Sequence, residues 1–490
     1  MRENMEPEGS QSTPTMTERI KLNGLPAEAS LSVDGELRWR IDAGDEQILD
    51  VESEVLGFSA DGREIRVNAF AHELKSPFCG SGTLGKRTMK DFVLEMPSES
   101  VAGIWGQRLR KYIDSLGRPK RFFIFLNPYG GKKYARRIFD TDIKPLLVAA
   151  NIIYTLQETE YHLHAQELSN KLDLLKYDGI VCVSGDGVLV EVLNGLLQRE
   201  DWATAIKVPL GIIPAGTGNG LAKSLLDAAG EMYSIQNATF AVIRGHKRAL
   251  DVTTVLQGKT MFFSILMLSW GLIADIDIES EKYRWMGHTR LYFYCFLRVM
   301  KLRKYHGNIE FVPAPGHEFY GEPKMEGETY VSDTEISEQG RVGGAEKLRG
   351  YQGASACFEV SDWRIMEGPF ISVMLVNVPW VTEDTFSAPE AKFSDGFLDL
   401  ILIKDCPRSA LASILVGAKD GAHIKSPYVM YLKVRAFKLV PGNRVGNPTE
   451  GGIIDVDGEV VARGEGDPMV YGPPIKINVD NGLATFFSHR

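Results

Sequence analysis

Residues 179–187 read GIVCVSGDG and place one carboxylate, Asp186, between two glycines where an apolar strand gives way to a helix. Glycines let backbone N–H groups approach phosphate oxygens closely, and the helix expected near 188–198 directs the positive end of its dipole at the same point. A carboxylate beside bound phosphates is costly, so we expect Asp186 to hold a metal ion or to accept a proton from an attacking hydroxyl. Asp-Gly is also an ordinary turn, and this segment alone leaves both interpretations open.

Two further segments repeat this strand-loop-helix pattern. The apolar run 122–126 leads into NPYGGKK at 127–133, and the run 210–213 leads into PAGTGNG at 214–220. In a parallel sheet the three strands end at one edge, so their glycine-bearing loops are predicted to line a single crevice. The first loop lacks the G-x-x-x-x-G-K-[ST] spacing of a P-loop, and neither it nor the third loop reads G-x-G-x-x-G.

These loops resemble the catalytic domain of the diacylglycerol kinase and sphingosine kinase superfamily, which transfers the γ-phosphate of ATP to a lipid hydroxyl. The longer matching stretches are SGDGVLVEVLNGL (184–196) and PLGIIPAGTGNGLAKSL (209–225). LSWGLIADIDIESEKYR (268–284) is similar to the segment that distinguishes sphingosine kinases, and DVDGE (455–459) fits as well. The resemblance implies an α/β nucleotide-binding lobe with a parallel sheet, followed by a largely antiparallel β-sandwich lipid-binding domain.

The chain divides into four parts by composition. Residues 1–20 are polar and are expected to be disordered. Residues 21–118 alternate like strands with one closing helix, so they form either a pleckstrin-homology-like module or an uncommitted β accessory domain. Residues 119–250 form the ATP-binding catalytic domain, and 251–490 form the lipid-binding domain with a flexible, Gly- and Glu-rich insertion at 313–355. Strands of this last domain are expected at 371–378, 397–403, 434–439, 453–462 and 475–487.

The overall composition is that of a globular protein. Hydrophobic residues make up 44% of the 490 residues, and the longest apolar stretch is shorter than the roughly 20 residues that a membrane-spanning helix needs. The polar N-terminus does not open a signal peptide, and five scattered cysteines are typical of reduced thiols. The net charge of −9 argues against nucleic-acid binding. We therefore expect a cytoplasmic protein that associates peripherally with internal membranes.

Phosphoryl transfer to an alcohol requires bound ATP, neutralised charge and a base near the hydroxyl. The resemblance puts this base at Asp186, where capping of the adjacent helix is a compatible structural role. It also implies a cationic clamp at Arg284 and Arg290, although two arginines on a polar helix face are common. Further nucleotide contacts are expected at Asn127, Gly130, Gly131, Lys132, Thr159, Ser184, Gly185, Gly187, Glu191, Gly216, Thr217 and Gly218.

ATP and Mg²⁺ are the expected cofactors, and the sequence points to no dedicated protein metal site. Magnesium in kinases is held by phosphates with a few carboxylates and waters. The resemblance implies that Glu459 orients the nucleotide or its magnesium, while the plain alternative is a residue that follows a hairpin turn. The plain alternative to a nucleotide contact is a helix cap for Thr159. For Glu191 it is a position on the surface.

Substrate recognition is expected at Asp275 and Asp277, which lie two residues apart after an apolar run and would share one side of a strand. Buried acids need a partner, and the ammonium group of a sphingoid base supplies one. The resemblance implies that Asp277 binds this head group with support from Asp275; pairing with Lys282 or Arg284 is the alternative. Six positions are expected either to line a tunnel for the acyl chain or to belong to the ordinary hydrophobic core. They are Leu268, Leu272, Ile273, Leu291, Leu415 and His423.

The segment from Arg290 to His306 combines aromatic and basic residues at helical spacing. It forms either a helix that rests on a membrane surface or a helix that packs into the core. The favoured function is ATP-dependent phosphorylation of sphingoid long-chain bases. A diacylglycerol or ceramide kinase and a non-catalytic lipid-binding scaffold are the alternatives, and a homodimer stays possible.

Overall fold

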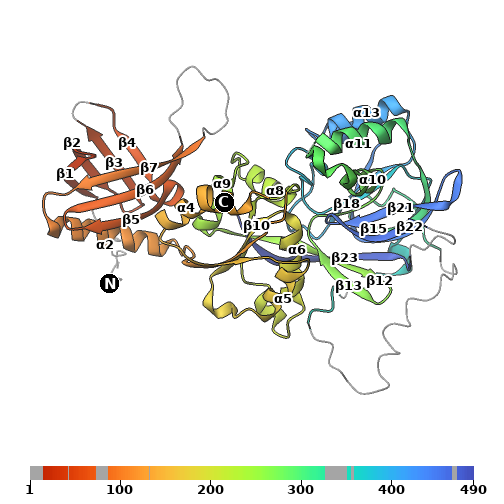
Figure 1. Cartoon of the computed structure of the whole chain (residues 1–490), viewed down its shortest axis with the longest axis horizontal. Coiled ribbons are helices and arrows are strands. Elements are labelled where there is room, and N and C mark those ends of the chain that lie inside the picture. Colours follow the sequence, from red (N-terminus) through yellow and green to blue (C-terminus); the bar gives the residue numbers. More distant parts are fainter. Residues whose placement is uncertain are drawn as a thin grey trace, which may run out of the picture.

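The computed structural model describes residues 15–41, 44–72, 86–131, 133–287, 289–325, 350–354, 358–465 and 472–489. Three parts follow one another along the long axis of the molecule (Figure 1). They are an N-terminal β domain, a central nucleotide lobe and a C-terminal β domain. Among the described residues, no helix is both long and apolar enough to cross a membrane.

The N-terminal domain is a seven-stranded antiparallel sheet in the described residues, with the order β4-β3-β2-β1-β7-β6-β5. Ser98 caps the closing helix α2, whose Trp105 is fully buried against the sheet. Strand β1 begins at Met16, so the expectation that residues 1–20 are disordered is wrong for residues 16–20. Residues 1–14 lie outside the described part. The elements are β1 (Met16–Leu22), β2 (Leu25–Leu31), β3 (Glu36–Ile41), β4 (Gln47–Asp50), α1 (Val51–Glu54), β5 (Val55–Asp61), β6 (Glu64–His72), β7 (Arg87–Glu95) and α2 (Glu99–Ser115).

The nucleotide lobe contains the predicted parallel strands in the order β11-β10-β8-β9. Helices cover both faces of this sheet, and all six residues of β10 are buried, as expected for a parallel strand between two helical layers. The strands are β8 (Arg121–Leu126), β9 (Ile153–Glu158), β10 (Gly179–Ser184) and β11 (Leu210–Pro214). The helices are α3 (Ala135–Ile138), α4 (Lys144–Ala149), α5 (His164–Lys171), α6 (Asp186–Leu197), α7 (Trp202–Ala205), α8 (Gly220–Ala228) and α9 (Ile235–Arg244).

The C-terminal domain is largely antiparallel, as predicted. The strand expected at 453–462 is instead a hairpin of two strands, because a turn at Asp457 and Gly458 interrupts it. The strands are β12 (Lys247–Gln257), β13 (Thr260–Ser264), β14 (Met267–Gly271), β15 (Tyr305–Pro313), β16 (Glu322–Pro323), β17 (Arg364–Glu367), β18 (Ser372–Val376), β19 (Leu398–Ile403), β20 (Met430–Arg444), β21 (Asn447–Val456), β22 (Glu459–Glu465) and β23 (Ile475–Phe487). The helices named below are α10 (Leu272–Glu279), α11 (Thr289–Met300) and α13 (Arg408–Gly417).

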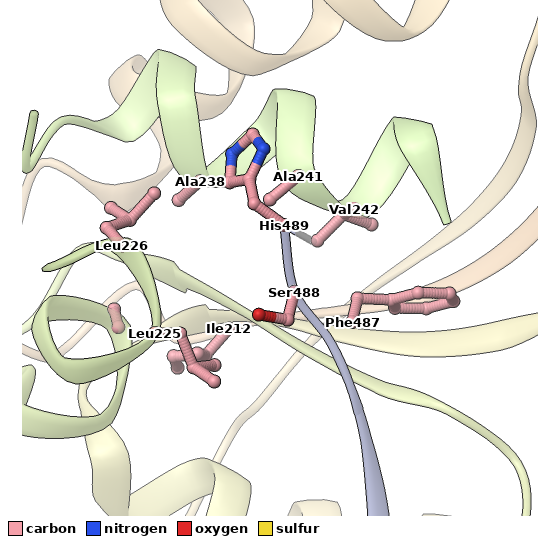
Figure 2. Close-up of a pocket in the computed structure, with 10 residues that line it drawn as sticks. Ile212, Leu225, Leu226, Ala238, Ala241, Val242, Phe487, Ser488 and His489 are labelled. Carbon is pink, nitrogen blue, oxygen red and sulfur yellow. The ribbon is translucent and has the colours of Figure 1, made fainter. Parts of the chain in front are cut away.

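Strand β23 joins the two lobes into one continuous sheet. It pairs antiparallel with β12 over most of its length and reaches β11 through the pair Leu210 and Phe486. Figure 2 shows the end of this strand, with Phe487, Ser488 and His489 lying between β11 and helices α8 and α9. The last residues of the chain therefore complete the core of the nucleotide lobe, beyond the boundary expected at residue 250.

The insertion expected at 313–355 is anchored at both ends. On its N-terminal side, β16 pairs with β17. On its C-terminal side, the ring of Tyr351 packs against Phe263 and Trp202, and its hydroxyl donates a hydrogen bond to Asp480. These described ends are part of the folded domain, and residues 326–349 lie outside the described part.

Candidate active site

The three glycine-bearing loops meet at the carboxyl edge of the parallel sheet, as the sequence predicts. A Cβ on Gly216 would lie 2.5 Å from the backbone nitrogen of Gly185, and one on Gly131 would lie 3.0 Å from the carbonyl carbon of Gly216. Real Cβ atoms do not approach backbone as closely as the contact at Gly216 would require, and at Gly131 the neighbouring backbone would have to shift. Gly131 also adopts a φ of 55°, which favours glycine. The three loops therefore contact one another through glycine backbone at the carboxyl edge of the sheet.

Polar side chains fix the shape of the first and third loops. The Asn127 side-chain oxygen accepts hydrogen bonds from the backbone N–H groups of Tyr129 and Gly130. The Asn219 side chain donates to the carbonyl of Gly216 at 3.1 Å. Asn127 thus acts on its own loop in this structure, which positions the neighbouring N–H groups. Lys132 lies outside the described residues.

The other predicted loop residues line the same place. Ser184 is buried, and its hydroxyl donates to the Gly185 carbonyl at 2.8 Å. Gly187, in the first turn of α6, and Gly218 both have open space where a Cβ would stand. Thr217 is half-buried in the turn of the third loop. The backbone at Gly187 and Gly218 is therefore not covered by neighbouring side chains on the Cβ side.

Asp186 lies in the first turn of α6 and is almost completely buried. One carboxyl oxygen, Oδ2, accepts a hydrogen bond of 2.7 Å from the backbone N–H of Gly220 and so caps α8. The other, Oδ1, is buried with no hydrogen-bond partner in the described part of the chain. Burial, reinforced by the charge of Asp457, raises the pKa of Asp186 to about 7. A carboxyl of this basicity with one oxygen free is suited to accept a proton near neutral pH.

The β21–β22 hairpin brings acids of the C-terminal domain to Asp186. Asp457, at the turn, accepts hydrogen bonds from the Ser264 hydroxyl at 2.9 Å and from the backbone N–H groups of Ile265, Leu266 and Met267 at 2.8 to 3.1 Å. Glu459 opens β22, as the hairpin interpretation predicts, and its charge raises the pKa of Glu191 on α6. The hairpin is therefore tied to the chain just before β14, and Glu459 lies within electrostatic reach of α6.

Sequence reasoning named Glu459 here but missed Asp455 and Asp457. The alternation of acids in IDVDGE is the signal that would have found them, since residues two apart on a strand share one face.

Glu191 and Thr159 have local roles in this structure. A carboxyl oxygen of Glu191 accepts a hydrogen bond of 3.1 Å from the Ala165 N–H at the start of α5, and another lies 3.7 Å from His162 Nδ1. Burial raises the pKa of Glu191. Thr159 is buried just after β9, and its N–H donates to the Leu126 carbonyl. Thr159 thus directly follows β9, and Glu191 joins α6 to the start of α5.

Asp277 on α10 and Arg290 on α11 lie within electrostatic reach of each other. Arg290 is buried and donates a hydrogen bond of 2.8 Å to Glu281. Burial raises the pKa of Asp277, the charge of Arg290 opposes this rise, and Glu281 and Glu459 add to it. Arg290, predicted to clamp phosphate, therefore lies among carboxylates. The side chain of Arg284 is outside the described part.

Asp275 does not support Asp277, which corrects the expectation from sequence. The segment forms helix α10 instead of a strand, so residues two apart point about 200° away from each other. Asp275 accepts a hydrogen bond of 2.7 Å from the Tyr305 hydroxyl and lies 3.5 Å from Arg303 and 3.7 Å from Arg298. Its ion partners are these arginines, and its role is to fasten α10 to β15 and α11.

The predicted acyl-tunnel residues separate into different clusters. Leu272, Leu291 and Leu415 meet in one apolar cluster between α10, α11 and α13. Ile273 packs against the core of the nucleotide lobe, and Leu268 belongs to the core of the β domain. His423 is buried, with Nε2 at 2.9 Å from the Ser387 carbonyl. Three of the six positions therefore share one apolar cluster.

The described residues contain no group of three or more His, Cys, Asp or Glu side chains arranged to hold a metal ion. The acids of the cleft are spread over α6, α10 and the β21–β22 hairpin. This donor set suits a Mg²⁺ ion that arrives on the phosphates of a nucleotide and takes one or two carboxylates from the protein.

Comparison with known families agrees with this architecture. The diacylglycerol kinase catalytic domain matches residues 121–255, and the YegS C-terminal NAD kinase beta sandwich-like domain matches residues 339–470. The fold and the site thus define a protein with a catalytic domain of the diacylglycerol kinase class.

Full-length relatives narrow this class. Sphingosine kinase 2 of Arabidopsis thaliana is 49% identical over 97% of this chain and 98% of its own length, and sphingosine kinase 1 of the same plant is 49% identical over 96% of each. Sphingosine kinase 1 of Homo sapiens is 33% identical over 71% of this chain and 87% of its own. The chain belongs to the sphingosine kinase family.

Proposed function

We propose that this protein transfers the γ-phosphate of ATP to the primary hydroxyl of sphingosine and related sphingoid long-chain bases, giving their 1-phosphates. The observation that carries the proposal is the carboxyl of Asp186, which has one free oxygen and a pKa of about 7 where the three glycine loops meet. The names of the relatives and their identity over the whole chain support the same reaction.

In this mechanism the glycine loops hold the phosphates of ATP through backbone N–H groups. The oxygen of the substrate hydroxyl attacks the γ-phosphorus in line, and Asp186 Oδ1 accepts the proton that this hydroxyl loses. Arg290 supplies positive charge near the transferred group, together with Arg284. Bound Mg²⁺ would neutralise phosphate charge, and Glu459 is the residue that we expect to hold it.

The head group of the substrate lies against Asp277 in this proposal, with the alkyl chain in the apolar cluster behind α10. Diacylglycerol and ceramide lack an ammonium group, so a buried carboxylate gains no ion pair from them. A scaffold without catalysis would not need an acid with a free oxygen at the phosphate loops. The contacts of Asp277 and Asp186 therefore favour the sphingoid base kinase over both alternatives.

The test is a kinase assay of the full chain with labelled ATP, Mg²⁺ and, separately, sphinganine, diacylglycerol and ceramide. Wild-type protein is expected to phosphorylate sphinganine only. Asp186→Asn should lower the rate at least a hundredfold, as loss of a general base typically does, whereas Asp173→Asn, on an exposed part of the same lobe, should not change it. Phosphorylation of the neutral lipids, or full activity of Asp186→Asn, would contradict the proposal.

Membrane association is proposed at the outer face of α11 and its neighbourhood. Trp285 is 82% exposed and Phe296 62% exposed, and Tyr292 and Met300 are also exposed. Two of the basic residues expected to face lipid form ion pairs within the protein. Arg303 pairs with Glu279, and Lys304 pairs with Asp405. Aromatic insertion is thus the stronger source of membrane affinity in this proposal. Peripheral association with internal membranes from the cytoplasm is part of the same proposal.

Phe296→Ser together with Met300→Ser should weaken binding to phosphatidylserine-containing vesicles in a flotation assay. Leu175→Ser is the matched control, since Leu175 is exposed on the nucleotide lobe far along the chain from α11. Equal binding of both variants would contradict the proposed membrane surface.

For the N-terminal sheet and its closing helix α2, a pleckstrin-homology-like identity remains our proposal, supported by seven strands followed by one helix.

A further inference from the structure

Trp380 follows β18 in the C-terminal domain and packs on helix α8 of the nucleotide lobe. Its indole N–H donates a hydrogen bond of 3.0 Å to Asp227 Oδ2, and its backbone N–H donates one of 3.0 Å to the Ser224 hydroxyl. The ammonium group of Lys223 lies 4.1 Å from the centroid of the indole ring, within the range of a cation–π contact. These three partners all belong to α8. One residue of the C-terminal domain therefore holds three side chains of this helix.

The first residue of α8 touches the same stretch of backbone. A Cβ on Gly220 would lie 2.5 Å from the carbonyl oxygen of Trp380 and 2.7 Å from the carbonyl carbon of Val381. Both distances are shorter than real Cβ contacts, so the absence of a side chain at Gly220 permits this approach. The backbone of Trp380 and Val381 thus supports the N-terminal end of α8.

Gly220 is also the residue that holds Asp186. Its backbone N–H donates the 2.7 Å hydrogen bond to Asp186 Oδ2, while Oδ1 has no hydrogen-bond partner in the described part of the chain. The orientation of the Asp186 carboxyl group therefore depends on the position of the first turn of α8. Trp380 and Val381 support that turn from the C-terminal domain.

The loop that carries Trp380 is fastened to its own domain. The indole ring stacks on Phe386 with the ring centroids 4.6 Å apart, and the Val381 N–H donates to the Thr385 carbonyl at 3.1 Å. The Phe386 N–H donates to the carbonyl of Ala418, at the end of α13, at 2.7 Å. Trp380 itself is only half-buried. The indole therefore rests on a braced loop, and its replacement does not open the hydrophobic core.

We infer that Trp380 is a positioning residue for phosphoryl transfer: it fixes α8 and, through the N–H of Gly220, the orientation of the Asp186 carboxyl group. Trp380 acts through α8 and not on the reacting atoms. The inference rests on the proposed function. It adds a residue of the C-terminal domain through which the action of Asp186 depends on contact between the two lobes.

The test is the pH profile of sphinganine phosphorylation by the full chain carrying Trp380→Leu. Burial raises the pKa of Asp186 to about 7, and hydrogen bonds from the backbone N–H groups of Gly220 and Leu221 oppose this rise. The titratable groups near Asp186 are Asp457, whose charge adds to the rise, and the Tyr233 hydroxyl, whose own pKa is raised by burial. A looser α8 weakens the opposing hydrogen bonds, so the pKa of Asp186 should rise.

A general base works in its deprotonated form, so a higher pKa of Asp186 makes the enzyme need a higher pH. In Trp380→Leu the acidic limb of kcat against pH should move upward by about half a pH unit or more. The rate at pH 7 should fall severalfold, and most of the loss should be recovered at pH 9.

Two further variants approach the same contact differently. Ser224→Ala removes the acceptor of the Trp380 backbone N–H without touching the indole ring, and it should move the acidic limb in the same direction by a smaller amount. Trp380→Phe keeps an aromatic ring over Lys223 and loses only the indole N–H. It should move the acidic limb less than Trp380→Leu does.

Glu310→Gln is the control for a general loss of stability. Glu310 is a buried acid of β15 that pairs with Lys324 at 2.8 Å and with Lys438 at 3.0 Å. Its substitution leaves these ammonium groups without their counter-charge. The melting temperature should fall, and the acidic limb should stay at its wild-type pH.

The outcomes distinguish the inference from the function on which it rests. If wild-type protein phosphorylates sphinganine and the acidic limb keeps its wild-type pH in both Trp380→Leu and Ser224→Ala, the inference is wrong and the kinase activity stands. A rate that falls by the same factor at every pH, with a lower melting temperature, would show a structural role and would also overturn it. Absence of sphinganine phosphorylation by wild-type protein would overturn the proposed function itself.

Discussion

At the scale of single residues, the two oxygens of Asp186 have different tasks. Oδ2 holds the N-terminus of α8, while Oδ1 stays free at the loops. The capping and catalytic interpretations of the sequence therefore coexist, although the capped helix is α8 and not α6. The cost of this arrangement is a buried charge, and that cost depends on pH.

Asp186→Asn should stabilise the protein in a defined pH window. The pKa is raised from 3.8 to about 7, so the folded form holds a proton that the unfolded form releases between these values. Stability from this group falls as pH rises from about 4 to about 7 and stays low above 7. Urea unfolding should show a gain of up to about 4 kcal/mol at pH 8, which shrinks toward zero near pH 4. A gain that is independent of pH would contradict this reasoning.

Gly216→Ala should distort the phosphate loops. Its Cβ would lie 2.5 Å from the Gly185 nitrogen, and backbone must shift to relieve that contact. We expect a lower melting temperature without nucleotide and a strongly raised KM for ATP. Gly218→Ala is the control, because its Cβ meets nothing within 4 Å, and its melting temperature should be unchanged. Equal melting temperatures for the two variants would argue against loop contact.

At the scale of elements, the β21–β22 hairpin and α10 are each held by one buried acid. The hairpin depends on Asp457, which is tied to the backbone just before β14. The helix depends on Asp275, whose partners come from α11 and from the chain leading into β15. Both anchors connect segments that are far apart in sequence.

Asp457→Ala should loosen the hairpin. The substitution leaves one hydroxyl and three backbone N–H groups without their acceptor, which costs on the order of 3 kcal/mol or more when such groups remain buried. Chemical denaturation should show the lower free energy of unfolding. The KM for ATP should rise, because Glu459 follows the same turn. Asp405→Ala, at an exposed ion pair with Lys304, is the control and should change stability by less than about 1 kcal/mol. Matching losses in the two variants would refute the anchoring role.

At the scale of the whole molecule, the N-terminal domain is packed firmly onto the nucleotide lobe. Arg87 of β7 forms a buried ion pair of 2.8 Å with Glu231, which follows α8. Its guanidinium also donates to the carbonyl groups of Ser53 and Phe70, and the ring of Phe70 packs edge-on against Phe240. These contacts connect the first domain to the lobe that carries Asp186.

Breaking this ion pair should destabilise the whole chain. Glu231→Gln leaves the Arg87 charge buried without its counter-charge, and such a loss typically costs about 3 to 5 kcal/mol. The double variant Arg87→Met with Glu231→Met should lose less than the single one, because no unpaired charge remains. Equilibrium unfolding in urea measures both. If Glu231→Gln unfolded like wild-type protein, the domains would not be coupled through this pair.

Much of the site followed from local sequence. The three loops converge as predicted, since a parallel sheet brings the ends of β8, β10 and β11 to one edge. The errors arose where partners come from a distance. Alternating Ile and Asp at 275–278 is typical of a strand, yet the segment is helical, with Tyr305 holding one acid and Arg290 beside the other. The tail of the chain likewise enters the nucleotide lobe through β23, which no local pattern indicates.

The sequence by itself determined the parallel sheet of the central lobe, the antiparallel C-terminal domain, the glycine loops and the position of Asp186, because strand periodicity and glycine spacing are properties of short segments. Only the tertiary structure decided which acids face one another. It tied Asp275 to Tyr305, Arg298 and Arg303, and it brought the charge of Asp457 within reach of Asp186. Electrostatic coupling falls with distance in space and is indifferent to separation along the chain, so it is fixed only when the fold brings the charges together.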